Sequence, residues 1–123
     1  GVSNSALGTY ALFANTTGVA NNAMGYNSML SNTTGFRNVA LGNAALYNNI
    51  SGSYNTAVGN NAFQIGANYS NSTALGYNTV ITASDQARIG NNAVTSIGGQ
   101  VGWTTVSDAR FKNENVQKVP GIE

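Results

Sequence analysis

The hydrophobic and polar positions of this chain repeat with a period of about 17 residues. Four successive units begin at Gly1, Gly18, Gly35 and Gly52, and they share the pattern G-x-x-N-x-A-Φ-G-x-x-A-Φ-x-x-N-T-T, in which Φ is apolar. The Ala-Leu-Gly core of the unit recurs at 74–76, and a shorter step leads from there to a related segment at 87–90. The repeats therefore predict about five or six structural units between residues 1 and 92.

A unit of about 17 residues predicts one coil of a parallel β-solenoid, built from two short strands and two corners. Helical repeats need about 33 residues or more, and propeller blades are longer still. Glycine at each corner would supply a positive φ without a Cβ clash, and asparagine tolerates the same region. A meander of hairpins would favour Asn-Gly or Asp-Gly turns, but neither dipeptide occurs among the 20 Asn and 15 Gly of the chain.

Stacked coils about 4.8 Å apart would align equivalent residues in ladders. We expect two apolar ladders to face the core. The first comprises Leu7, Met24, Leu41, Val58 and Leu75, and the second comprises Leu12, Met29, Leu46 and Phe63. Asn15, Asn32 and Asn49 are expected to form an amide ladder that bonds from coil to coil. A further recurring column consists of Asn4, Asn21, Asn38 and Asn55.

The small apolar content of each coil predicts an obligate oligomer. Ordering one coil costs roughly 25 kcal/mol at about 1.5 kcal/mol per residue. Two or three large apolar side chains per coil return only about 2 kcal/mol each. Burial against sister chains would close the gap, and the alanine columns would let neighbouring backbones approach. We expect a homotrimer.

Composition narrows the possible functions. Only 7% of the 123 residues are charged and the net charge is +1, so the chain lacks the basic footprint of proteins that bind nucleic acid or anionic membranes. Without Cys or His, it cannot carry a Cys/His zinc site, a Cys nucleophile or a Ser-His-Asp triad. No apolar run approaches the roughly 20 residues of a membrane span. We expect no cofactor, no metal and no membrane insertion in this segment.

The repeat resembles the head repeats of trimeric autotransporter adhesins and the collar and shaft repeats of phage tail fibres. The resemblance covers residues 1 to about 92 and rests on the N-x-A-Φ-G motif. It implies a homotrimeric parallel β-roll outside the cell, on a virion tail fibre or a bacterial surface. A host-surface glycan or protein receptor is an implied partner. The six tyrosines could form a glycan-binding surface, pack between chains or be plain edge residues: Tyr10, Tyr26, Tyr47, Tyr54, Tyr69 and Tyr77.

The composition changes sharply towards the C-terminus. Residues 1–84 contain one charged side chain, Arg37, whereas residues 107–123 contain six. We expect residues 1–92 to form the rod and 93–106, with the sole tryptophan Trp103, to form a short neck. Residues 107–123 would be the helical or irregular start of another domain. The chain opens in repeat phase without a signal peptide, so we expect it to be a piece of a longer protein.

The segment Ser107-Asp108-Ala109-Arg110-Phe111-Lys112-Asn113 resembles the start of the endosialidase-type intramolecular chaperone, an autoprotease with the motif S-D-x-R-x-K-x-N. The resemblance implies cleavage between Val106 and Ser107. Ser107 would be the nucleophile, Lys112 its base and Asp108 an orienting group. A desolvated lysine can activate a serine without histidine. The chaperone body does not follow in this sequence, so we expect at most a single self-cleavage when that body is present, and otherwise no enzyme.

The same residues allow a second interpretation of the junction. Ser107 and Asp108 also fit a helix N-cap, with Pro120 as a later stop. For the whole chain, the shaft or tip of a phage tail fibre is the leading expectation. The head of a bacterial surface adhesin and a structural surface filament without a ligand are the alternatives.

Overall fold

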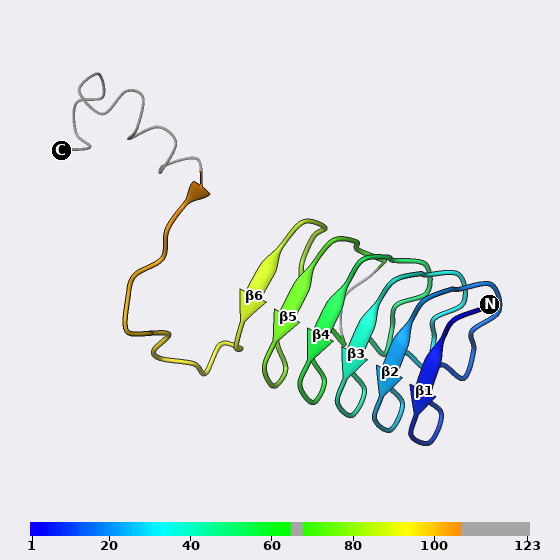
Figure 1. Cartoon of the computed structure of the whole chain (residues 1–123). Helices are drawn as coiled ribbons and strands as arrows, with labels where there is room; N and C mark the ends of the chain where they lie inside the picture. Colours follow the sequence, from blue (N-terminus) through cyan, green and yellow to red (C-terminus); the bar gives the residue numbers. More distant parts are fainter. Residues whose placement is uncertain (65–67, 107–123) are drawn as a thin grey trace.

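The computed structural model describes residues 1–64 and 68–106, and in this part of the chain a single stack of coils forms a parallel β-solenoid (Figure 1). Six three-residue strands lie side by side in the order β1-β2-β3-β4-β5-β6. Their bounds are β1 Ser5–Leu7, β2 Asn22–Met24, β3 Val39–Leu41, β4 Thr56–Val58, β5 Thr73–Leu75 and β6 Ala87–Ile89. The predicted all-β solenoid is confirmed.

The strands pair in a register that follows the sequence period, so that equivalent residues of successive units lie side by side. Ala6 pairs with Ala23, Ala23 with Ala40, and the same offset continues to Ala74. Between β5 and β6 the offset becomes shorter, so that Arg88 of β6 lies beside Ala74 of β5. Each coil therefore adds one strand to the sheet, and the last coil is shorter than the others.

Each coil contains one strand, and the second strand predicted for the opposite wall does not form in the described residues. That wall is a run of tight turns. The amides of Ala11, Phe13 and Asn15 donate to carbonyls three residues earlier, at 3.2, 3.2 and 3.1 Å. Between these turns, the amide of Leu12 reaches Ser28 in the next coil, at 3.1 Å. The prediction of two strands per coil is therefore wrong, although the wall is still hydrogen-bonded from coil to coil.

The turn wall depends on left-handed residues that are not glycine. Tyr10 and Leu12 have φ values of 62° and 54°, and their equivalents Asn27 and Met29 have 61° and 47°. A left-handed conformation costs an L-residue roughly 1–2 kcal/mol. The hydrogen bonds between coils and the burial of residues such as Met29 must outweigh this strain, because it recurs in successive coils.

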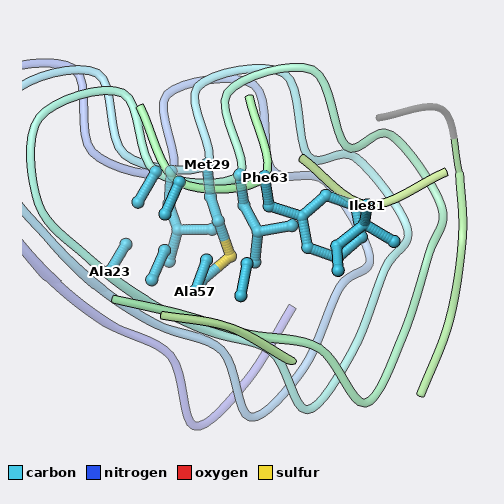
Figure 2. Packing of buried hydrophobic residues seen from close by; sticks show 11 residues of the cluster. Ala23, Met29, Ala57, Phe63 and Ile81 are labelled. Carbon is cyan, nitrogen blue, oxygen red and sulfur yellow. The ribbon is translucent and has the colours of Figure 1, made fainter. Parts of the chain in front are cut away.

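The core lies between the sheet and the turn wall. Met29, Phe63 and Ile81 project from one wall toward Ala23 and Ala57 on the other (Figure 2). All five are at most 3% exposed. The predicted inward ladder is confirmed, and its members Leu12, Met29, Leu46 and Phe63 are between 0% and 9% exposed.

The other predicted core ladder faces outward, so that prediction is wrong. Leu7, Met24, Leu41, Val58 and Leu75 are 64%, 49%, 41%, 38% and 37% exposed. Successive side chains of a strand point to opposite faces. The central alanine of β1 to β5 is on the core side of the strand, so both flanking residues must face outward. The alanines of β2 to β5 are thus covered within their own chain and offer no close approach to a neighbouring one.

Asparagine side chains join the coils at two corners. Asn32 Nδ2 donates to Asn15 Oδ1 at 3.0 Å, and Asn49 Nδ2 donates to Asn32 Oδ1 at 2.8 Å. This confirms the predicted amide ladder. The second column uses the backbone as well: Asn38 Nδ2 donates to the Gly52 carbonyl at 2.8 Å, and Asn38 Oδ1 accepts from the Asn55 amide at 2.9 Å.

Two kinds of glycine close the coils. Gly42, after β3, has φ 131°, and a Cβ there would lie 2.6 Å from the carbonyl oxygen of Gly59. Gly35, which opens a unit, does not have a positive φ, but its Cβ would clash with Asn32 Oδ1 and the Gly52 carbonyl. The expectation that every corner glycine supplies a positive φ is therefore wrong for the opening glycines, which are needed for close approach between coils.

Ser28 offers a simple test of how much a buried hydroxyl without a hydrogen-bond partner destabilises the fold. It is fully buried, and its Oγ has no hydrogen-bond partner. The equivalent positions in neighbouring coils are Ala11, Ala45 and Ala62. Because a buried hydroxyl without a partner costs about 1–3 kcal/mol, we expect Ser28→Ala to raise the free energy of unfolding by about 1 kcal/mol. Urea denaturation would measure it, and a loss of stability would show that Oγ is bonded in solution.

Candidate functional site: the outer face of the sheet

The outer face of the sheet carries a continuous row of large apolar side chains. We call this the outer apolar row. It comprises the last residue of each strand: Leu7, Met24, Leu41, Val58, Leu75 and Ile89. The strand register aligns each member with the next. All six are at least 37% exposed, so the row crosses every coil without interruption.

A second outward row starts each strand and is more polar. Its members are Ser5, Asn22, Val39, Thr56, Thr73 and Ala87. Between the two rows, the face of β1 to β3 is hollowed by a shallow depression of about 200 Å³. Neither row contains a charged residue. The outer face therefore combines one apolar ridge with a neighbouring band of hydroxyl, amide and small side chains.

Aromatic side chains gather in the first two coils. Tyr10 contacts Phe13 edge-on, with ring centroids 5.3 Å apart, and its ring centroid lies 6.3 Å from that of Tyr26. These three rings are 50–69% exposed. Tyr54 instead contacts Phe36, at 5.2 Å. The six tyrosines therefore do not form one surface, because they occupy several different positions of the repeat.

Groups that could perform catalysis are sparse in the described part of the chain. Residues 1–64 and 68–106 contain no cluster of three His, Cys, Asp or Glu side chains that could hold a metal ion. The charged side chains in these ranges are Arg37, Asp85 and Arg88. The carboxylate of Asp85 accepts a 2.7 Å hydrogen bond from Asn71 Nδ2, which is a surface contact between coils. No helix within the described ranges is long and apolar enough to cross a membrane.

The expected junction begins where the described residues end. Trp103 and Val106 are 85% and 87% exposed, and residues 95–106 contain no strand. The predicted self-cleavage residues Ser107, Asp108 and Lys112 lie outside the described residues. Of the proposed scissile bond, only Val106 is described, and its exposure would leave it open to a second domain.

The sequence missed two features of this site. One is the outward direction of the outer apolar row. The alanine that precedes the row residue in β1 to β5 could have indicated this direction, because only a small residue fits on the core side of so thin a coil. The other is Arg88, which pairs with Ala74 and takes the alanine position in the last strand.

Searches against protein-family models, curated proteins and solved structures found no match, so the functional argument rests on the fold and its surface.

Proposed function

We propose that this chain is a segment of the shaft or tip of an extracellular trimeric fibre, of the kind that phages carry on their tails. The observation that supports it most is the stack of coils with one uncharged apolar row along its outer face. A solenoid extends by adding coils, and each coil contacts only its neighbours along the axis. Such an element spans distance, and it presents whatever surface its coils carry.

The role is mechanical because hydrogen bonds join each coil to the next at every side. The strands pair in parallel, the turn wall bonds between coils, and asparagines bridge two corners. Pulling along the axis would load many of these bonds at once. This arrangement favours a load-bearing rod over an enzyme acting on external substrates.

Two alternatives share the same fold. The head of a bacterial surface adhesin would add a receptor-binding role, and the exposed cluster of Tyr10, Phe13 and Tyr26 supports this candidate. A structural filament would need no ligand. A glycan array probed with the intact protein and with Tyr10→Ala separates the two, because only an adhesive surface would lose binding. Tyr77→Ala, which changes an exposed tyrosine elsewhere, is the matched control.

The proposal includes maturation by self-cleavage between Val106 and Ser107. The support is the sequence motif that begins at Ser107, directly after the expected rod and neck. In the intact gene product, the Ser107 hydroxyl would attack the Val106 carbonyl after giving its proton to Lys112. The peptide bond would break as the ester forms, and the freed amine of Ser107 would take up a proton. Water would then hydrolyse the ester and release the fibre with Val106 at its end.

We expect the intact gene product to yield a fragment ending at Val106 and its Ser107→Ala variant to remain whole, because alanine lacks the nucleophilic hydroxyl. The denatured mass of both proteins would measure this. Thr105→Ala, which changes a neighbouring hydroxyl, is the control and should still be cleaved. A wild-type protein that stays whole would leave the junction as a simple neck and favour an uncleaved adhesin or filament.

A further inference from the structure

We propose that a cleft at the C-terminal end of the stack binds a saccharide that carries a carboxylate. Arg88 would hold the carboxylate, and a column of asparagines beside it would hold the sugar hydroxyls. This inference goes beyond the mechanical role proposed above and does not depend on it, because the last coil forms the cleft whether the rod is a shaft, an adhesin head or a filament.

The cleft lies where the chain leaves the last coil, at the end of the stack remote from the N-terminus (Figure 1). We call it the amide cleft. Its volume is about 930 Å³. Small-molecule sites commonly measure about 300–1,000 Å³, so the cleft has room for a short oligosaccharide. The turn wall and the last coil both contribute to its lining, which includes Asn61, Asn78, Val80, Arg88, Ile89 and Asn92.

The guanidinium of Arg88 supplies the charge of the amide cleft. The Arg88 side chain is exposed. Asp85 is the sole carboxylate side chain in residues 1–64 and 68–106, its Oδ1 accepts a hydrogen bond from Asn71 Nδ2 at 2.7 Å, and within these ranges no ion pair involves Arg88. A guanidinium that lines a cleft without a protein anion suits a carboxylate, which it can bind by two parallel hydrogen bonds.

Three asparagines line the amide cleft as a column, one from each of the last three coils. Asn61 and Asn78 are equivalent left-handed residues of successive units, with φ values of 57° and 52°. Asn92 follows Asn78 by the same shortened step that leads from Ala74 to Arg88. Coils lie about 4.8 Å apart, and the sugar rings of an extended oligosaccharide follow one another at a similar interval. The column can therefore present one amide to each of several successive rings.

The amide groups of this column are accessible to a ligand. The side chains of Asn61, Asn78 and Asn92 are half-buried or exposed, and in the part of the chain that the structure describes they form no hydrogen bond with another residue. Each amide offers two donor hydrogens and an acceptor oxygen. This combination suits sugar hydroxyls, because each hydroxyl both donates and accepts.

Hydrogen bonds fix one wall of the cleft to the coil before it. Asn91 Nδ2 donates to the Tyr77 carbonyl at 2.9 Å, and Asn91 Oδ1 accepts from the Ala93 amide at 2.8 Å. A wall that is already ordered reduces the entropy lost on binding. The aliphatic side chains of Val80 and Ile89 line the same cleft and can contact the C–H groups of a sugar ring.

Two other classes of ligand fit the amide cleft less well. A nucleic acid would need several basic groups along its phosphates, and Arg37 and Arg88 are the two basic side chains in the described ranges. An extended peptide would have to add a strand to the free edge of β6, and a charged residue on an edge strand disfavours such addition. An acidic saccharide needs one cation and several amides, and it needs no strand pairing.

Isothermal titration calorimetry of the intact protein with trigalacturonate tests the site. We expect saturable binding that the methyl ester of the same trisaccharide does not show, because esterification removes the negative charge. Arg88→Ala should lower the affinity at least tenfold and preserve the fold, since alanine occupies this position in β1 to β5. Arg37→Ala, which removes another exposed arginine, is the matched control and should bind as tightly as the wild type.

Two further variants test the geometry of binding. Asn78→Ala should lower the affinity about threefold or more through the loss of hydrogen bonds to the sugar. The fold accepts alanine at this position, because Ala44 holds the equivalent place with φ 57°. Arg88→Lys keeps the charge but not the two parallel hydrogen bonds, so its affinity should lie between those of the wild type and Arg88→Ala.

The outcomes separate this inference from the proposed function. A lack of saturable binding at millimolar trigalacturonate, or wild-type affinity in both Arg88→Ala and Asn78→Ala, would overturn the site and leave the fibre standing. Equal binding of the methyl ester would overturn the role of the carboxylate, as would tighter binding of galactose sulfate than of galacturonate. A loss of binding in Arg37→Ala that equals the loss in Arg88→Ala would overturn the location of the site.

Discussion

Replacing Asn38 by alanine is expected to lower the free energy of unfolding by roughly 2–4 kcal/mol, because truncation removes three buried hydrogen bonds that join successive coils and leaves one buried amide without a partner. The side chain is fully buried. Its Nδ2 donates to the Gly52 carbonyl at 2.8 Å and to Asn21 Oδ1 at 3.1 Å, and its Oδ1 accepts from the Asn55 amide at 2.9 Å. The Asn55 amide would lose its partner, which costs about 1–3 kcal/mol. The Gly52 carbonyl keeps its bond from Asn49 Nδ2 and Asn21 Oδ1 keeps its bond from the Asn38 amide, both at 3.0 Å, so these two acceptors each lose one donor only.

Urea denaturation at a fixed protein concentration would measure the effect, because oligomerisation makes apparent stability depend on concentration. Asn43→Ala is the control. Asn43 is exposed, so its loss should change the free energy of unfolding by less than about 0.5 kcal/mol. Equal effects of the two substitutions would mean that the buried asparagine column does not hold the coils together.

Gly42→Ala is the second substitution with a large expected effect. The φ of 131° at Gly42 lies in a region that L-residues rarely adopt, and the new Cβ would lie 2.6 Å from the Gly59 carbonyl oxygen. The coils must move apart or the corner must change conformation. Backbone strain of this kind costs about 1–3 kcal/mol, and the clash adds to it, so we expect a loss of roughly 3 kcal/mol or more by the same measurement.

Ala20→Gly is the counterpart at a left-handed residue that is not glycine. Ala20 has φ 57°, so glycine relieves strain of roughly 1–2 kcal/mol. The greater freedom of glycine in the unfolded chain offsets about 0.5–1 kcal/mol of this gain, so we expect stability to stay the same or rise by up to about 1 kcal/mol. A large loss would show that the Ala20 methyl group has a packing role.

The period and the residue types of the repeat were sufficient to predict the solenoid. A recurring Gly, Asn and Ala at fixed positions excludes helical repeats, and the lack of Asn-Gly turns disfavours hairpins. The buried ladder from Leu12 to Phe63 followed from the same pattern, because large apolar residues at one position of a coil have to pack together. These predictions depend on the spacing and the types of the repeated residues, which stacking places at equivalent positions of successive coils.

The direction of the strand residues could not be predicted from apolarity. Leu7 and Leu12 look alike in sequence, yet only Leu12 faces the core. The strand alternates, so the choice lies between burying one alanine and burying its two neighbours. The large residues of the turn wall already fill the space between the walls, and only alanine fits opposite them. The direction of the strand residues can therefore be predicted only when the positions of both walls are known.

The conformation of the turn wall could not be predicted from the sequence for a different reason. Leu12 and Met29 are poor candidates for a positive φ, so no local signal predicts that they adopt it. Their conformation is imposed by hydrogen bonds to neighbouring coils, such as that from Leu12 to Ser28. The junction chemistry at Ser107 and Lys112 depends on a resemblance and stays a prediction. The outer apolar row, which the fold presents as a site, was assigned to the core.

Arg88 gives the stack of coils a defined end. It occupies the inward position that alanine fills in β1 to β5. Its side chain is exposed at the end of the stack, and a charged residue on an edge strand disfavours the addition of another strand. Another coil of the same kind could not bury this side chain against its own alanine without stranding the charge. The last coil therefore ends the rod by chemistry as well as by its shorter length.

The near identity of the coils has a consequence for how the rod folds. In the proposed trimer, a chain that winds one unit out of step with the other copies would still align alanine with alanine and asparagine with asparagine, so the repeat itself would hardly penalise such a slip. Proteins of this kind can begin folding at any repeat. Correct alignment must then depend on the irregular units, such as Tyr69 in place of the opening glycine and the shortened step to β6. These departures from the consensus would determine which coil of one copy lies beside which coil of another.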